Sequence, residues 1–500
     1  MILHRGRQWP VGHGGFFTGE ISCEPPGDWP PFRYVYDCGA LTRNGLDPAI
    51  DTYLNDVAST TGVIDLVVVS HVDEDHVKGL KRLIAGPVPV RRVMMPLLSP
   101  TDRLIALARS AETNDGEGRP DGGGPGGGGD DTFGAEFALF PEEVLASYGV
   151  EVVFVSGDDD GGEPLGPDPV VDDGDPWAPD EEFEVDETYG RGERDEWDRH
   201  TPGAKHDHWG DERAEPWNPL SPGMHRSRYD DMPWQTGSPS DLDPDRSRYG
   251  GREGAPPGMR MAGFGPVRAS RSGRSVTMSH RNGLVLRERT RGATWLLAPY
   301  VAPRVTAQRD RFIAALAGAG RRIEDFEGPL DEYSLRRIVD DMGALRQAYR
   351  AAGGTNAGSL SLYSGPLPRD TASAFIEIGD PWTPERAMRY PVAAPGTLMT
   401  GDSELARRGA VGDLLHHYGG YADSVGILHL PHHGSSDNFR SQLLRAFPRL
   451  RFALAMTPTR DPRGNHPSRA VIDDVLAANV LPHQVTTDAV STVVTLASVG

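Results

Sequence analysis

Four side chains that can bind a divalent metal lie within six residues of one another: His71, Asp73, Asp75 and His76. They follow the apolar run 63–69, whose β-branched residues predict a buried strand. The residues after the cluster have the spacing of a helix. The cluster would therefore lie at the carboxyl end of a strand, where open α/β sheets place their binding sites. Histidine and carboxylate groups in this position are typical of a centre that holds a catalytic divalent metal.

Three later segments also carry polar side chains just after a predicted strand. These side chains are Asp402, the pair His432 and His433, and His466. Taken singly, each has a simpler explanation, such as a turn residue, a surface pair or the start of a helix capped by Ser468. Their joint occurrence after an equally placed first cluster favours one site assembled from distant parts of the chain.

The elements expected along the chain alternate between strands and helices, which indicates α/β layers. Before the middle of the chain they are a hairpin of residues 12–21 and 32–39, a helix at 47–58, a strand at 90–95 and a helix at 101–112. Later elements are strands at 294–301, 359–364, 398–400, 425–430 and 452–457, and helices at 308–317, 330–352 and 469–478. The dipeptide Asn282-Gly283 also predicts a hairpin turn between strands at 275–278 and 284–288.

The acidity of the chain is concentrated in one segment. Residues 157–200 hold 18 Asp and Glu against three Arg, which accounts for −15 of the formal net charge of −21. From 157 to about 261 the chain is rich in Pro, Gly, Asp and Arg without hydrophobic periodicity, so we predict disorder. We divide the chain into a first half at 1–112, a Gly/Pro-rich acidic insertion at 113–261 with a short ordered piece at 133–156, and a second half at 262–500 with a helical segment at 308–352.

The cysteine content and the N-terminus indicate a cytoplasmic protein without a membrane partner. Two cysteines, Cys23 and Cys38, are too few for a Cys-based zinc site or a disulfide framework. The first residues lack the apolar core of a signal peptide. No apolar run approaches the roughly 18 residues that a membrane span needs.

Taken together, the motifs resemble those of the metallo-β-lactamase superfamily. The closer resemblance is to the soluble metallohydrolase domain of the DNA-uptake channel protein of competent bacteria, and to its stand-alone relatives. The matching segments are 11–15, 36–39, 70–79, 355–360, 400–402, 432–435 and 465–468. They cover both halves of the chain but not the acidic insertion. The resemblance implies a four-layer αββα sandwich with a metal site at one edge.

The resemblance also implies roles for the site residues. His71 and Asp73 would serve one metal, Asp75 and His76 would serve a second, and Asp402 would bridge the two. The superfamily usually has a histidine where Asp73 stands. A carboxylate there makes the site harder, so manganese, magnesium or iron join zinc as candidate ions.

Two features of the ligand set stay open. Either His432 or His433 matches the later histidine ligand of the superfamily, and the sequence does not choose between them. No third-site histidine is evident between the first cluster and Asp402, so we expect one or two ions, with one position weakly occupied or filled only with substrate. To Asp37, His13 and His429 we assign structural roles.

A centre of this kind predicts a hydrolase, since a divalent metal lowers the pKa of bound water from about 15.7 to about 7. Asp75 would orient the water or accept its proton, and His466 would protonate the leaving group or bind a phosphate oxygen. We expect a phosphodiesterase or nuclease acting on nucleic acid or nucleotides. One alternative is hydrolysis of a small ester, thioester or lactam. Another is a non-catalytic metal-binding module that recruits a protein partner through the acidic insertion.

Overall fold

The computed structural model describes most of the chain outside its middle, in stretches of different length. They are residues 1–24, 30–60, 62–116, 132–157, 259–262, 267–269, 275–288, 293–302, 306–326, 338, 340–353, 358–367, 370, 372–380, 387–459 and 466–500. The predicted disorder between 157 and 261 therefore falls almost entirely outside the described residues. The same holds for Asn465 and for the beginning of the helix predicted at 330–352.

Two β-sheets form the centre of the molecule. Among the described residues, the larger sheet has 11 strands in the order β14-β13-β19-β1-β2-β3-β4-β5-β6-β9-β8. They are β1 (Ile2–Gln8), β2 (Phe16–Cys23), β3 (Phe32–Cys38), β4 (Leu66–Val68), β5 (Arg92–Pro96), β6 (Glu151–Ser156), β8 (Val267–Ala269), β9 (Ser275–Ser279), β13 (Ala372–Ile378), β14 (Met388–Val392) and β19 (Val493–Val499).

The smaller sheet has eight strands in the described part of the chain, in the order β18-β17-β16-β15-β12-β11-β10-β7. They are β7 (Met259–Ala262), β10 (Gly283–Arg287), β11 (Thr294–Val301), β12 (Leu360–Pro366), β15 (Gly396–Met399), β16 (Val425–His429), β17 (Phe452–Met456) and β18 (Leu481–Val485). The division expected between residues 261 and 262 thus falls inside β7.

Alternating side chains along the strands separate the hydrophobic cores. Val68 of β4 and Trp295 of β11 point into a core that both sheets share. Val67 and Val69 point to the opposite face of the larger sheet, and Leu296 points to the opposite face of the smaller one. Each sheet is therefore apolar on both faces, as expected for sheets that other elements cover on both sides.

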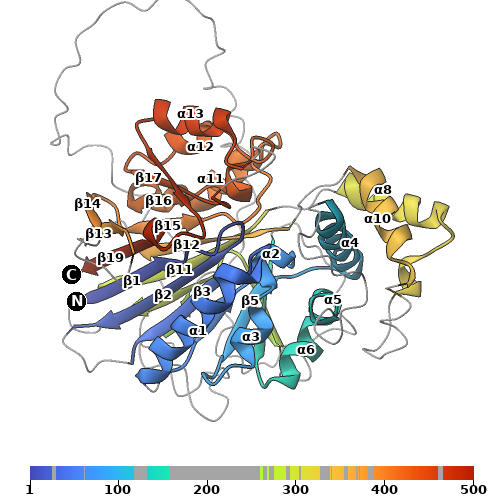
Figure 1. Ribbon diagram of the computed structural model, residues 1–500, viewed down its shortest axis with the longest axis horizontal. Coiled ribbons are helices and arrows are strands. Elements are labelled where there is room, and N and C mark those ends of the chain that lie inside the picture. Colours follow the sequence, from blue (N-terminus) through green and yellow to red (C-terminus); the bar gives the residue numbers. More distant parts are fainter. Residues whose placement is uncertain are drawn as a thin grey trace, which may run out of the picture.

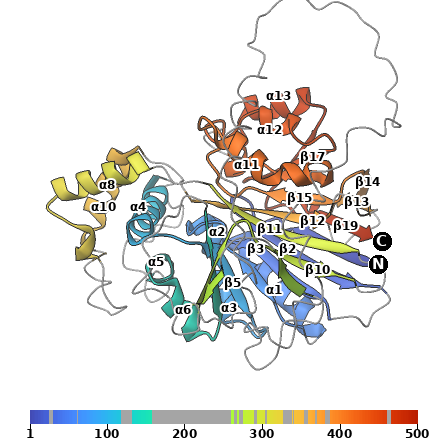
Figure 2. The ribbon, with the colours of Figure 1, turned by 180° about the vertical axis from the view of Figure 1, so that it is seen from behind.

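Helices cover the two outer faces (Figure 1). The larger sheet carries α1 (Arg43–Ser59), α3 (Leu80–Ile84), α5 (Thr132–Leu139) and α6 (Pro141–Ser147), and the smaller sheet carries α11 (Ala410–Tyr418), α12 (Gln442–Arg445) and α13 (Arg469–Ala477). A separate helical group of α4 (Pro100–Gly116), α8 (Thr306–Gly318) and α10 (Met342–Ala352) has its own apolar core. Figure 2 shows this group at the end of the sheets opposite the two termini. The structure is mixed α/β, as predicted.

Several predicted elements are confirmed. The opening hairpin forms between β2 and β3, which pair antiparallel. The piece expected at 133–156 contains two helices, and its strand β6 lies within the larger sheet between β5 and β9. Ser468 caps α13, because its side chain accepts a hydrogen bond from the Val471 amide.

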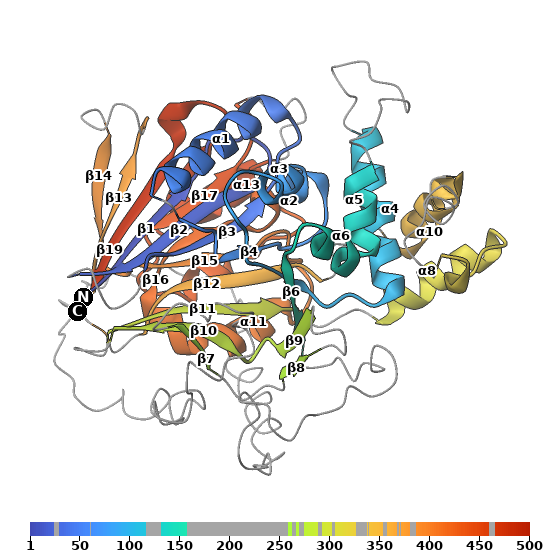
Figure 3. The same ribbon diagram turned by 90° about the horizontal axis from the view of Figure 1, so that it is seen from below.

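The hairpin predicted at Asn282-Gly283 is wrong. β9 pairs parallel with β6 in the larger sheet, whereas β10 pairs antiparallel with β11 in the smaller one. Figure 3 shows the two strands beside these different partners. The turn therefore carries the chain from one sheet to the other, since pairing with distant strands outweighs the local turn signal.

His4 of β1 is a polar contact in the core between the sheets. Its Nε2 lies 3.0 Å from the hydroxyl of Tyr34 in β3, and its ring stacks on Trp295 of β11 with centroids 4.2 Å apart. Burial lowers the pKa of His4 to about 3. The folded protein therefore keeps this ring neutral over a pH range in which an unfolded chain protonates it.

This difference predicts a pH dependence of stability. Between about pH 6.5 and about pH 3 the unfolded state binds a proton at His4 that the folded state does not, so the free energy of unfolding falls as the pH falls. We expect His4→Gln to reduce the slope of that free energy by about 1.4 kcal/mol per pH unit between about pH 4 and about pH 5.5. Urea unfolding at a series of pH values, in the presence of a chelator, measures this slope. The exposed His416 supplies the control His416→Gln; equal slopes in wild type and His4→Gln would contradict the prediction.

Candidate metal centre

Strand ends from both sheets place the predicted site residues at one edge. β4 ends two residues before Ser70, and the chain then carries His71 and Asp73 to the short helix α2 (Glu74–Val77). β15 ends three residues before Asp402. The parallel neighbour of β15, β16, leads to the segment η6 (Pro431–Gly434), which contains the histidine pair. The ends of β15 and β16 meet at one edge because these strands are parallel neighbours. The packing of the two sheets on a shared core brings the end of β4 against them, so segments about 330 residues apart meet here.

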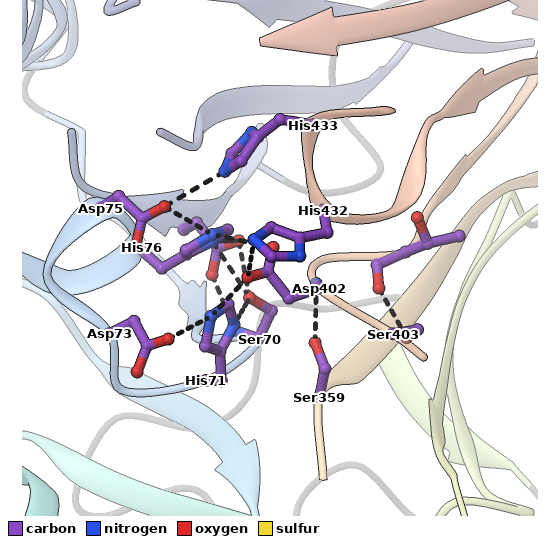
Figure 4. A network of polar contacts seen from close by, with 12 residues as sticks. Ser70, His71, Asp73, Asp75, His76, Ser359, Asp402, Ser403, His432 and His433 are labelled. Atoms are coloured by element: carbon purple, nitrogen blue, oxygen red, sulfur yellow. Dashed lines mark hydrogen bonds and ion pairs between the residues drawn. The ribbon is translucent and has the colours of Figure 1, made fainter. Parts of the chain in front are cut away.

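Asp402 lies between two histidines of the first cluster (Figure 4). Its Oδ2 is 3.3 Å from His71 Nε2, and its Oδ1 is 3.3 Å from His76 Nε2. Asp73 Oδ2 lies 3.3 Å from the same His71 nitrogen. The two oxygens of one carboxylate thus face two neighbouring positions, which we call position A (His71, Asp73 and Asp402) and position B (Asp75, His76, Asp402 and His433).

At position B, Asp75 is the common neighbour of several histidines. Its Oδ2 lies 3.1 Å from His433 Nε2, 3.6 Å from His76 Nε2 and 3.8 Å from His13 Nε2. Burial alone would raise the pKa of Asp75, but His76 and then His433 outweigh it and hold that pKa well below its usual range. Asp75 is therefore a carboxylate at neutral pH.

The geometry separates the two members of the histidine pair. His433 is buried and belongs to two of the groups of ligand atoms that could hold a metal among the described residues. His432 belongs to none of these described groups. Its Nε2 lies 3.7 Å from Asp402 Oδ2, its Nδ1 lies 2.9 Å from Asn438 Oδ1, and its side chain is 32% exposed. His433 thus lies where it could bind a metal, whereas His432 lies at the more exposed border of the group.

Both histidines have left-handed backbone conformations, with φ of 46° at His432 and 56° at His433. Such conformations cost non-glycine residues of order 1 kcal/mol each, and they persist where surrounding contacts impose them. Here the His432 amide donates to the Gly401 carbonyl, and the Ser468 amide donates to the Gly434 carbonyl. These bonds fix the pair against Asp402.

Asp37, to which we assigned a structural role, is a hydrogen-bond partner of the centre. It accepts hydrogen bonds from the Ser70 amide (2.7 Å), the Ser70 hydroxyl (2.8 Å) and His76 Nδ1 (2.7 Å). The Ser70 hydroxyl oxygen can then accept from His71 Nδ1, 2.9 Å away. Both rings therefore carry a proton on Nδ1 and turn Nε2 toward the carboxylates, as metal-binding histidines do.

The two Nε2 atoms provide a test of whether the site fits a metal. Neither Nε2, of His71 or of His76, makes a hydrogen bond within the described part of the chain, although both are buried and face carboxylate oxygens. Burial would lower the pKa of His76, but Asp75, Asp37 and Asp402 raise it well above its usual value. The surrounding carboxylates therefore favour positive charge at these two nitrogens, and a divalent cation would supply it.

His13 supplies the additional histidine that the sequence did not reveal. It forms a metal-capable group with Asp75 and His433, and its ring centroid lies 4.3 Å from that of His433. Burial and then His433 lower the pKa of His13 to about 3, so its ring is neutral and can bind a cation. Its signal was the Gly-His-Gly-Gly segment at the beginning of the chain, far from the first cluster.

The remaining histidines divide between the rim and the core. The ring centroid of His466 lies 5.2 Å from that of His432 and 5.3 Å from that of His13, so His466 stands beside the centre without joining the described ligand groups. His429 is buried against Phe17, and burial lowers its pKa to about 3. The structural role assigned to His429 fits this position.

No family model matches the chain, and no curated protein matches it. In the described part of the chain, none of the helices has the length and apolar character needed to cross a membrane.

Proposed function

We propose that this chain is a metal-dependent hydrolase of the metallo-β-lactamase type that cleaves phosphodiester bonds in nucleic acid or nucleotides. One observation carries the proposal: His71 and His76 direct their buried Nε2 atoms toward the two oxygens of Asp402, and neither Nε2 makes a hydrogen bond within the described part of the chain. The layer order supports it, because two sheets with a shared core and helices on both outer faces are what the resemblance implies.

The chain's own residues would divide the work as follows. When bound, a divalent metal supplies Lewis acidity, which activates water near neutral pH and polarises a phosphoryl oxygen. Asp402 holds the two positions together through its separate oxygens. Asp75 would bind the metal and orient the water. It would not take up the proton of that water, because the pKa of Asp75 lies well below its usual range. His466, which lies beside His13 and His432, would protonate a leaving group or bind a phosphate oxygen.

The ligand types favour phosphodiester chemistry over hydrolysis of neutral substrates. Asp73 supplies a carboxylate where a histidine would make position A softer, so manganese and magnesium suit it as well as zinc. Two neighbouring positions that favour positive charge and share one carboxylate would suit the attacking and leaving oxygens in displacement at phosphorus. We therefore expect phosphate esters to be better substrates than carboxylic esters or lactams.

The test is turnover by the full-length protein after removal of metal and reloading with Mn²⁺ or Zn²⁺. Substrates are single-stranded DNA, RNA, bis(p-nitrophenyl) phosphate and p-nitrophenyl acetate. We expect Asp402→Ala to lower phosphodiester turnover by about a thousandfold or more, since the metal contributes several kcal/mol of transition-state stabilisation. The control is Asp437→Asn, which changes an exposed carboxylate four residues beyond His433. The phosphodiesterase assignment fails if wild type and Asp402→Ala both match buffer; cleavage of the acetate ester alone would move it to ester hydrolysis.

A further inference from the structure

Helix α4 places a buried cation beside position A. Arg109 Nε lies 2.9 Å from Asp73 Oδ1 and 2.7 Å from Asp73 Oδ2, and both side chains are buried. Helix α10 holds α4 in place, since Arg346 Nη2 donates to the Ala111 carbonyl at 2.8 Å and Leu345 packs in the shared helical core. The guanidinium is therefore a fixed part of the wall of the centre.

Arg109 changes the charge balance of position A. A guanidinium stays protonated in proteins and has no acceptor, so it cannot bind a metal and can only repel one. Its pairing with Asp73 compensates one of the two carboxylates at position A. The remaining ligands are the His71 imidazole, which supplies no negative charge, and the shared Asp402 carboxylate. A divalent ion at position A would therefore be weakly held, because buried charges are poorly screened.

Position B has no such compensation. Within the described part of the chain, every ion-pair partner of Asp75 is a histidine: His13, His76 and His433. Asp402 adds a second carboxylate. Position B thus combines two carboxylates with up to three imidazoles, a stronger ligand set than that of position A.

We propose that the centre is asymmetric, with one divalent ion held tightly at position B through His13, Asp75, His76, Asp402 and His433, and with Arg109 supplying the positive charge at position A. This inference rests on the proposed metal centre, but it does not depend on which substrate is cleaved. Arg109 acts here as a positioning residue that sets the number of ions. Position A would fill only at high metal concentration.

Metal stoichiometry tests this directly. The full-length protein is stripped with chelator, titrated with Mn²⁺ in a calorimeter, and analysed for bound metal by mass spectrometry after desalting. We expect one tight equivalent in wild type and in Arg109→Lys, which retains the charge. Arg109→Gln should bind a second equivalent at least about 10-fold more tightly than wild type does. His13→Gln should weaken the tight equivalent by about 10- to 100-fold, the range for altered metal-site surroundings.

The outcomes separate this inference from the proposed function. Two equivalents of equal affinity in wild type would overturn the asymmetry while leaving the hydrolase proposal intact. No tight equivalent in wild type would overturn both. If Arg109→Gln does not fold, Asp73→Asn tests whether the tight ion binds at position B, because this substitution removes a ligand of position A only. Retention of the tight equivalent in Asp73→Asn supports the proposal, and its loss contradicts it.

Discussion

Adding Mn²⁺ or Zn²⁺ to the chelator-treated protein is expected to raise its melting temperature by about 4–5 °C, and Asp402→Asn is expected to remove most of that rise. An ion that binds only the folded state stabilises it by about 4 kcal/mol when its concentration is roughly a thousand times Kd. In a chain of this size, each kcal/mol shifts the midpoint by at most a few degrees. Asp402 matters most because its two oxygens face His71 and His76 at the same 3.3 Å.

The thermal shift is read for each protein against its own metal-free state, by differential scanning calorimetry. This comparison removes any change that the substitution makes to the metal-free fold. Asp437→Asn should keep the full shift, because this carboxylate is exposed on the segment after η6. Equal shifts in wild type and Asp402→Asn would show that the stabilising ion binds elsewhere.

Site residues that lie close together in sequence or directly follow a strand could be predicted, because a local sequence pattern indicates them. The run 63–69 predicts β4, and the cluster from His71 to His76 follows it directly. Asp402 and the histidine pair carry the same signal after β15 and β16. Because β15 and β16 are parallel neighbours, the rule for strand ends brings Asp402 and the histidine pair to one edge. The cluster after β4 reaches them only through the packing of the two sheets.

Residues that join the centre from distant elements were not predictable in the same way. Arg109 lies in the middle of a helix, and only the packing of α4 places it against Asp73. Asp37 lies within β3, next to its last residue, and its contact with Ser70 and His76 depends on β3 lying beside β4. The choice of His433 depends on left-handed backbone angles that no sequence pattern specifies.

The strand partners of the chain ends were equally hidden. β1 pairs along its length with β19, so that Ile2 lies opposite Val499. Neither strand was predicted, because pairing between the two ends of a chain leaves no local turn signal. The opposite case is β9 and β10, where the Asn282-Gly283 turn signal predicts a hairpin although the two strands belong to separate sheets.

The glycine at the end of the segment 36–39 provides the second large effect. Gly39 donates its amide proton to the Gly15 carbonyl, and Gly15 in turn donates to the Asp75 carbonyl. A Cβ at Gly39 would lie 2.5 Å from backbone atoms of both Asp75 and His76. Main-chain atoms cannot move aside as a flexible side chain does, so the loop that carries two ligands of position B must shift.

We therefore expect Gly39→Ala to lower the free energy of unfolding by about 3 kcal/mol, at the upper end of the cost of overpacking, and to weaken Mn²⁺ binding by at least about 10-fold. Urea unfolding in chelator measures the first effect, and calorimetric titration measures the second. Gly412→Ala is the matched control, since an added Cβ in α11 meets no atom within 4 Å and favours the helix. If Gly39→Ala unfolds and binds metal as wild type does, then close contact between this glycine and the ligand loop is not what holds Asp75 and His76 in place.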